Sequence, residues 1–308
     1  MSFRVTSSTL SHSVMNGLQA NLSRLQQTQE QLSSGRRINR MSDSPVDAAA
    51  AMRLRAEQAA NEQVGRNIDD GLSTLGAADT AFTSMSSMVR RVRQLVVAGL
   101  NGVNGPGERE AMATEIDQLR GGLIALANTQ YLGRPIFAGT QDVPTAYDAT
   151  GKYLGNASAV QRSVSTDGST RLDVTVTGPE AFSTFFGDPA APANPADPAG
   201  AGILTRISAA LRAPGGPAAL DAELAKLDAA SATMQSARSV VGARFNRLLG
   251  IQGAGESTLD SVTAKLAIAE NIDLPKTIID MQIQSTSYQA ALGAAAKIIQ
   301  PSLLDFLR

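Results

Sequence analysis

The stretch Gln31–Met52, QLSSGRRINRMSDSPVDAAAAM, lies between two long segments with helical periodicity and interrupts them sharply. Gly35 can adopt the left-handed backbone conformation that ends a helix. Ser44 is a favourable N-cap residue, and Pro45 suits the first position of a helix. Asp47 adds a negative charge to the first turn, where the helix dipole favours it. The stretch therefore predicts two helices joined by a short elbow that runs from Gly35 to Ser44.

Much of the remaining chain also repeats apolar residues at steps of three and four, the pattern of amphipathic helices. Inside the C-terminal part, residues 249–260 (LGIQGAGESTLD) are expected to be weakened or locally irregular because of their glycines. Pro275 is expected either to kink the last helix or to mark the point where it joins its predecessor. We expect helices from about Thr6 to Ser34, from Pro45 to about Leu100, from near Pro106 to beyond Leu126, and across the region from about Ala218 to Phe306.

The central region, between about Gly133 and Gly202, has a different pattern, since polar and apolar residues alternate with a period of two. Asp167 and Gly168 separate two such runs, and this arrangement predicts a β-hairpin. A Pro- and Ala-rich stretch, residues 187–203, follows it and is typical of an exposed loop. The expected fold class is mainly α with a small β insertion. The N- and C-terminal segments would form a long antiparallel helical bundle or coiled coil, with the β-rich domain inserted in the middle.

The composition offers little for catalysis or for nucleic-acid binding. The formal net charge is −1, so the charge balance gives no support to nucleic acid or an anionic membrane as a partner. The chain has one histidine, His12, and no cysteine, which argues against a zinc site or a cysteine nucleophile. The basic cluster of Arg90, Arg91 and Arg93 lacks interleaved aromatic residues and is interpreted as a charged helix face. We therefore expect no enzyme activity, no cofactor and no metal.

The two terminal segments are poor in large apolar side chains for their length. The first predicted helix spans roughly 43 Å at about 1.5 Å per residue. Even when it is paired with the apolar side of the C-terminal helical segment, this helix buries too little apolar surface to offset the entropy lost when its backbone is ordered. We therefore expect both ends to be disordered or marginal in the monomer and to fold when several copies pack together. The residues expected at this assembly interface are Met15, Leu18, Leu22, Leu25, Leu32, Ile278, Met281, Tyr288, Leu292, Ile299, Leu303 and Leu304.

Residues 32–51, LSSGRRINRMSDSPVDAAAA, resemble the N-terminal signature of the flagellin superfamily, in which a helix, a short spoke and a second helix follow in this order. Two further stretches, NTQYLGRPIFAGTQ at 128–141 and SYQAALGAAAKIIQPSLLDFLR at 287–308, are similar to one branch of that superfamily, the hook-associated junction proteins. The sequence departs from the signature at Ser44, where a second Asp is common, and at Asp47, where Gly is common. The positions of the signature that match are Leu32, Ser33, Ser34, Gly35, Arg37, Ile38, Asn39, Asp43 and Pro45.

The resemblance implies a layered assembly. Residues 1–40 and 263–308 would form inner-core helices around a central channel. Residues 41–135 and 205–262 would form a helical rod outside them, and residues 136–204 a β-rich outer insertion. The elbow would be the spoke between the two helical layers, and the residues expected to shape it are Gly35, Asn39, Asp43, Ser44 and Pro45.

The resemblance also implies a function and its partners. The chain would be an extracellular structural adaptor between hook and filament, assembled coaxially through its terminal helices. Its partners would be copies of itself in a ring or helical layer, hook-associated protein 1 on the hook side, flagellin on the filament side, and a cytoplasmic export chaperone. The resemblance also implies export by the flagellar type III route, and the absence of a recognisable cleavable signal peptide is consistent with that route. No run of about 20 apolar residues predicts a membrane span.

Two alternatives stay open. The first is a filament-forming flagellin, although RPIFAG at 134–139 and LLDFLR at 303–308 favour the junction branch. The second is a surface enzyme or adhesin built on a flagellin frame. Its chemistry would have to lie in the central insertion, yet residues 140–200 contain no His or Cys and few clustered carboxylates.

Overall fold

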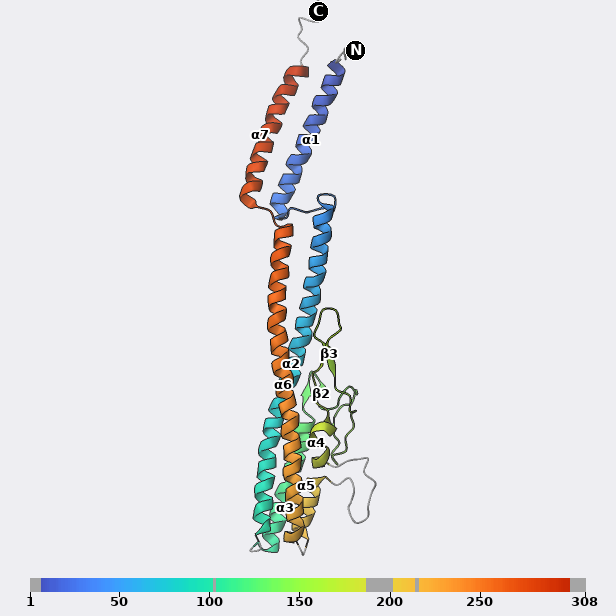
Figure 1. The fold of residues 1–308 in the computed structure, drawn as a ribbon, viewed down its shortest axis with the longest axis vertical. Coiled ribbons are helices and arrows are strands. Elements are labelled where there is room, and N and C mark those ends of the chain that lie inside the picture. The colour runs from blue at the N-terminus through green and yellow to red at the C-terminus, as the bar shows by residue number, and fades with distance from the viewer. Residues whose placement is uncertain (1–6, 102–103, 187–201, 214–215, 300–308) are drawn as a thin grey trace, which may run out of the picture. The chain divides into compact units, whose positions relative to one another are not determined.

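The structure is a computed structural model that describes residues 7–101, 104–186, 202–213 and 216–299 (Figure 1). Within these ranges the helices are α1 (Ser7–Ser34), α2 (Pro45–Leu100), α3 (Pro106–Ala127), α4 (Gly178–Phe186), α5 (Ile203–Arg212), α6 (Gly216–Glu270) and α7 (Leu274–Ile299). The strands are β1 (Gln130–Tyr131), β2 (Arg134–Pro135), β3 (Gln161–Ser163) and β4 (Arg171–Asp173). The fold is therefore mainly α with small antiparallel strand pairs, as the sequence predicts.

The chain divides into two compact units. Unit 1 combines the two ends of the chain, Met1–Ala59 and Leu259–Arg308. Unit 2 is the continuous stretch Ala60–Thr258 between them. Unit 2 is therefore inserted within unit 1 along the sequence.

The helix starts follow from local chemistry. Pro45 opens α2 as predicted, and the carbonyl of Ser44 accepts the first helical hydrogen bond from the N–H of Ala48 at 2.8 Å. At α3, Pro106 takes the first position, and the carboxylate of Glu108 accepts a hydrogen bond from the N–H of Gly105 at 3.1 Å. This bond satisfies a backbone donor that the helix itself cannot pair.

The structure decides two expectations for the C-terminal region, the irregularity at residues 249–260 and the role of Pro275. Residues 249–260 form a continuous part of α6, so the expected irregularity is absent there. Each glycine costs a helix only about 0.5–1 kcal/mol, and the buried Leu248 and Val262 pack the helix on either side of this stretch. Pro275 is the second residue of α7, so it lies at the junction of the two helices rather than at a kink. Proline is tolerated there because the first helical turn has no use for its missing N–H.

In unit 1, α1 and α7 lie side by side and run antiparallel, so the start of α1 and the end of α7 are at the same end of the pair (Figure 1). Thr28 of α1 and Thr277 and Ala295 of α7 are the buried residues of this pair among those whose side chains the structure describes. A long helix pair is thus present as predicted, but its interface buries small and polar residues rather than large apolar ones.

Unit 2 holds the core. The three- and four-residue repeat of apolar side chains predicted for α2 is buried at Leu75, Phe82, Met85, Val89, Val92 and Val96, and Leu72 is partly covered. Phe82 of α2 contacts Phe137 and Phe182, with ring centroids 5.5 and 5.6 Å apart. The rings of Phe82 and Phe137 meet edge to face, at an interplanar angle of 75°, and such a pair adds to the stabilisation from burial alone. Further buried side chains come from α3, α5 and α6, at Ile116, Leu123, Leu204, Ile207, Leu211, Leu220, Leu227, Met234, Val241 and Leu248.

The central region contains the predicted hairpin in a shorter form. β3 and β4 pair antiparallel, with Arg162 opposite Leu172, and Gly168 in the connecting turn has φ 71°. The strands are three residues long, and the last part of the alternating run folds as α4 instead. A helix forms because Phe182, Phe185 and Phe186 recur at helical spacing and are all buried. Residues 187–201, most of the expected loop, lie outside the described residues.

A second, unpredicted hairpin joins β1 to β2. Tyr131 pairs with Arg134, so Leu132 and Gly133 form a two-residue turn. Both have positive φ, 49° and 79°, as a type I′ turn requires. Leu132 is the one non-glycine residue with positive φ in the described part of the chain. An Asn-Gly pair is the usual solution here, and an L-residue with a full side chain costs roughly 1–2 kcal/mol in this conformation.

Candidate assembly interface

The face of α1 that meets α7 is centred on Thr28, which is 6% exposed. The hydroxyl of Thr28 lies 2.8 Å from Oε1 of Gln284 in α7 and 2.9 Å from the carbonyl oxygen of Arg24, so its single proton is shared between these acceptors. Hydrogen bonding offsets the cost of burying a polar group between the helices.

The α1 residues expected at an assembly interface fall into two groups. Leu18, Leu25 and Leu32 are half-buried along the side that faces α7. Met15 and Leu22 are 48% and 39% exposed. Met15 and Leu22 are seven positions apart and therefore lie on one side of the helix. The contact between α1 and α7 does not cover this side of α1.

The α7 residues divide in the same way. Met281 and Tyr288 are half-buried, whereas Ile278 and Leu292 are exposed. Ile299 ends the helix but its side chain lies outside the described residues, as do Leu303 and Leu304 altogether.

Sequence reasoning missed a second apolar side of α7. Ile279 and Ile283 are 59% and 58% exposed, and they are one helical turn apart. At 100° per residue they lie on the side opposite to the buried Thr277 and Ala295, which face α1. The apolar spacing of Ile278, Met281, Tyr288 and Leu292 predicts a single stripe on this helix, and Ile279 and Ile283 lie outside it. A helix with apolar residues on opposite sides is typical of one buried on both.

The elbow is anchored to the end of α6, within unit 1. Gly35 has φ 69°, as predicted for a residue that ends a helix, and its N–H donates to the carbonyl of Gln31 at 2.9 Å. The N–H of Arg37 donates to the carbonyl of Glu270 at 2.6 Å, and the N–H of Ile272 donates to the carbonyl of Gly35 at 3.3 Å. These two bonds place the elbow beside the α6–α7 connection as a short antiparallel bridge.

The two departures from the family signature, Ser44 and Asp47, are hydrogen-bonded to each other, and Asp47 also pairs with Arg37. One guanidinium nitrogen of Arg37 lies 2.9 Å from Oδ2 of Asp47 and 3.0 Å from the carbonyl oxygen of Ala269. The hydroxyl of Ser44 donates to that same oxygen of Asp47 at 2.9 Å. Asp47 thus links the start of α2 to the elbow and, through Arg37, to the end of α6.

The remaining elbow residues close its tight turn. Oδ2 of Asp43 accepts hydrogen bonds from the N–H groups of Asn39 and Arg40, at 3.1 and 2.9 Å. Side-chain bonds of this kind let Asp stabilise a turn without regular secondary structure. Sequence reasoning missed Glu270, a buried carboxylate that Arg55 contacts at 2.8 Å. Nothing local marks such a pair, because its members are 215 positions apart.

The basic cluster on α2 is engaged within the chain. Arg91 pairs with Glu115 at 2.6 Å and Arg93 with Asp228 at 2.8 Å. The hydrogen bond to Glu115 raises the pKa of Arg91, and the one to Asp228 raises the pKa of Arg93. These pairs agree with the interpretation as a charged helix face. His12 is exposed.

Neither a metal cluster nor a membrane span is found in the described ranges. They contain no group of three or more His, Cys, Asp or Glu side chains arranged to hold a metal ion. The helices of this part of the chain are also not long and apolar enough to cross a membrane.

Comparison with known proteins finds similarity to proteins of the bacterial flagellum. Residues 5–142 match the family described as the bacterial flagellin N-terminal helical region. Flagellar hook-associated protein 3 of Escherichia coli (strain K12) is 26% identical over 284 residues, which cover 86% of this chain and 87% of that protein. Flagellin of Bacillus subtilis (strain 168) is 28% identical over 315 residues, covering 96% of each.

A solved structure described as that of a flagellar hook-associated protein from Vibrio parahaemolyticus has a TM-score of 0.63 at 23% identity. It covers 74% of this chain and 99% of that one, so the two share a fold. Residues 5–142 therefore carry the domain described as the bacterial flagellin N-terminal helical region, and most of the chain is similar to flagellar hook-associated protein 3.

Proposed function

We propose that this chain is a structural adaptor of the bacterial flagellum that joins the hook to the filament by coaxial assembly through α1 and α7. The observation that carries the proposal is the incomplete burial of this helix pair. Met15 and Leu22 on α1, and Ile279 and Ile283 on α7, are exposed on sides that the other helix does not cover. Neighbouring copies packed around these sides would bury them and supply the stabilisation that the pair alone lacks.

The proposed layers follow the expectation from the resemblance. Residues 1–40 and 263–308 form the inner core, 41–135 and 205–262 the rod, and 136–204 the outer insertion. The elbow is the spoke, and its bonds to Glu270 and Asp47 support a fixed rather than a flexible connection. The assembly interface comprises the twelve residues named from the sequence together with Ile279 and Ile283.

The partners follow from the position in the assembly. A tube is built by a heterologous contact that repeats without closing on itself. An adaptor within it contacts copies of itself, hook-associated protein 1 on the hook side and flagellin on the filament side. We also propose that a cytoplasmic export chaperone holds the C-terminal segment before type III export to the cell surface. In this role the chain acts mechanically and not as an enzyme.

A filament-forming flagellin is the second candidate, favoured by the similarity to Bacillus subtilis flagellin along 96% of this chain. The stretches 128–141 and 287–308 support the junction role instead, because they resemble the hook-associated branch.

Deletion of the gene in the source bacterium separates the two. If the chain is the junction, hooks stay bare and monomeric flagellin accumulates in the medium, and the intact gene on a plasmid restores filaments. If the chain is the filament subunit, filaments disappear and no flagellin is shed. Normal filaments after deletion would refute both roles.

A further inference from the structure

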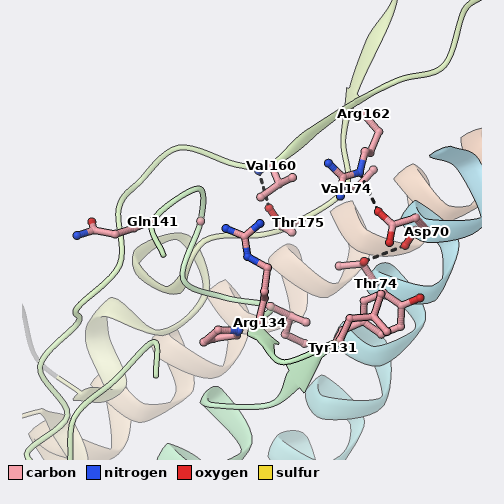
Figure 2. A pocket seen from close by; sticks show the side chains of 13 residues that line it. Asp70, Thr74, Tyr131, Arg134, Gln141, Val160, Arg162, Val174 and Thr175 are labelled. Atoms are coloured by element: carbon pink, nitrogen blue, oxygen red, sulfur yellow. Dashed lines mark hydrogen bonds and ion pairs between the residues drawn. The ribbon is translucent and has the colours of Figure 1, made fainter. Parts of the chain in front are cut away.

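A pocket of about 110 Å³ opens in unit 2, bounded by α2, the β1–β2 hairpin and the segments around β3 and β4 (Figure 2). Asp70 and Thr74 of α2 form one wall and the hairpin forms another. Since the liquid volume of one water is about 30 Å³, the pocket holds only a few waters or the end of one side chain. A drug-sized ligand does not fit, because its pockets are typically about 300–1,000 Å³.

Two hydrogen-bond donors in this pocket have no acceptor among the described residues. The guanidinium of Arg134 makes no hydrogen bond there, and its ion partner Asp142 is 3.8 Å away on a side chain that is 94% exposed. Thr175 is 6% exposed, and its hydroxyl oxygen accepts the N–H of Val160 at 2.8 Å, which leaves its own proton free to donate. Arg134 and Thr175 both line the pocket, so an anionic acceptor that enters it, such as a carboxylate, meets a guanidinium and an unused hydroxyl proton.

The neighbouring cation is already neutralised. Nε of Arg162 pairs with Oδ2 of Asp70 at 2.8 Å, as the dashed line in Figure 2 marks. Arg134, whose side chain is 63% exposed and whose one ion pair is the long contact with Asp142, is therefore the less neutralised cation of the pocket, and buried Val174 and Ile136 add an apolar lining.

The rim of the pocket carries Leu132, the strained residue of the hairpin turn. Its side chain is 80% exposed, so packing within the unit does not offset the unfavourable φ of 49°. Asn would relieve the strain at this position, because it adopts the left-handed region readily and is common in type I′ turns. A strained and exposed large apolar residue at the edge of a pocket points to a contact outside the chain.

We propose that this pocket and Leu132 bind a neighbouring protein subunit that presents an Asp or Glu side chain beside an apolar one. The carboxylate enters the pocket and accepts hydrogen bonds from Arg134 and Thr175, while Leu132 packs against the apolar side chain. A small carboxylate alone would leave Leu132 uncovered, so a protein surface fits the site better. The identity of the neighbour as a flagellar subunit rests on the proposed function.

The substitution Leu132→Asn separates folding from binding. In the full chain it leaves the melting temperature of unit 2 unchanged or raises it, because the turn relaxes. In cells that lack their own copy of the gene, it raises the flagellin shed into the medium severalfold relative to the parent chain. Arg134→Gln has the same effect on shedding, and Val240→Ala, which trims an exposed apolar side chain elsewhere on unit 2, does not. Shedding equal to the parent for both pocket variants overturns the proposal.

A cross-linking experiment tests whether this site binds a neighbouring subunit, and its result does not depend on the junction role. A photoreactive phenylalanine analogue is placed at position 132 of the full chain, or at position 240 as a control, and flagella are isolated and irradiated. We expect an adduct from position 132 with one flagellar subunit, attached close to an Asp or Glu and reduced severalfold by Arg134→Gln. An adduct yield no higher than at position 240, which a small-molecule ligand would also give, refutes the proposal. If cross-linking succeeds while deletion leaves filaments normal, the proposed function fails and the binding site stands.

Discussion

Thr28 and Gln284 meet across the α1–α7 pair with 2.8 Å between Oγ1 and Oε1, although they are 256 positions apart in the sequence. The structure surrounds this polar contact with half-buried leucines on α1 and with Met281 and Tyr288 on α7. A polar pair in an apolar seam fixes the register of two helices, because sliding either helix would bury both groups without partners.

The first prediction concerns this contact. Thr28→Val keeps the volume but leaves Gln284 without its partner, and should weaken the assembled state by about 1 kcal/mol. The double variant with Gln284→Leu removes both polar groups and should recover part of that loss. Filament detachment on heating measures the effect. Losses that simply add in the double variant would contradict a direct interaction.

The second prediction concerns the chain ends. Because the α1–α7 pair buries no large apolar side chain in its described part, protease should rapidly cut residues before about Ser42 and after about Ser261 in dilute solution. Mass spectrometry should find a resistant middle fragment. In assembled flagella the same ends should be protected. Equal resistance along the free chain would mean that the ends do not depend on neighbours to fold.

The third prediction concerns the elbow. Gly35→Ala should cost about 1–2 kcal/mol, because φ is 69° while a Cβ there would meet nothing within 4 Å. Gly168→Ala is a matched control, with φ 71° and the same open space in the β3–β4 turn.

We expect both alanine variants to lose similar stability, but only Gly35→Ala to shed filaments, as counted by electron microscopy. Gly35→Asn should restore retention, since Asn tolerates the left-handed region. Equal shedding by the two alanine variants would show that general stability, and not the elbow, is responsible.

The fourth prediction concerns glycines within helices. Alanine at Gly250, Gly253 or Gly255 of α6 has room for its Cβ and should stabilise the chain by about 0.5–1 kcal/mol per site. Gly71→Ala in α2 should instead destabilise it by about 1–3 kcal/mol, because the new Cβ would lie 2.9 Å from Cγ1 of Val174. Thermal unfolding of the four variants checks both signs.

The fifth prediction concerns pH. Burial opposes the charged form of Glu223, but Lys226 and Arg206, at 2.8 and 3.0 Å, outweigh it and hold the pKa of Glu223 below its ordinary 4.5. A folded-state pKa below the unfolded one stabilises the fold above pH 4.5, and this stabilisation is lost as pH falls through the folded value.

Glu223→Gln should therefore lower the melting temperature at neutral pH and flatten its decline between about pH 5 and pH 3. Glu115→Gln is the control. Its ion pair with Arg91 is solvent-exposed and should contribute little to stability, so the melting temperature should change little. A melting curve for Glu223→Gln that declines as steeply as the parent's would contradict the assignment.

Local signals in the sequence were sufficient for the long helices. Pro45, Pro106 and the glycine at position 35 mark helix ends through their own backbone preferences, and these ends appear where expected. The alternation in residues 174–177 predicts a longer strand, but β4 ends at Asp173 and α4 begins at Gly178, where the helical spacing of Phe182, Phe185 and Phe186 applies. A strand pattern and a helix pattern that adjoin within a few residues are resolved only by what the tertiary core can bury.

The elbow and the helix pair were predictable in position but not in their contacts. The signature at residues 32–51 located the elbow, and apolar spacing located the helix pair. The bonds from Arg37 to Glu270 and from Arg55 to Glu270 join residues that lie more than two hundred positions apart, and no local pattern encodes them. The strain at Leu132 was equally hidden, since Leu-Gly is not a usual type I′ sequence.

The insertion of unit 2 within unit 1 has a consequence for the timing of folding. All of Ala60–Thr258 leaves the ribosome before the second half of unit 1 does, so unit 2 has its complete sequence first. α1 must wait for α7, whose residues are synthesised after all of unit 2. Any partner that occupies α7 during this interval keeps unit 1 open without touching unit 2, and its release starts the pairing of the two ends.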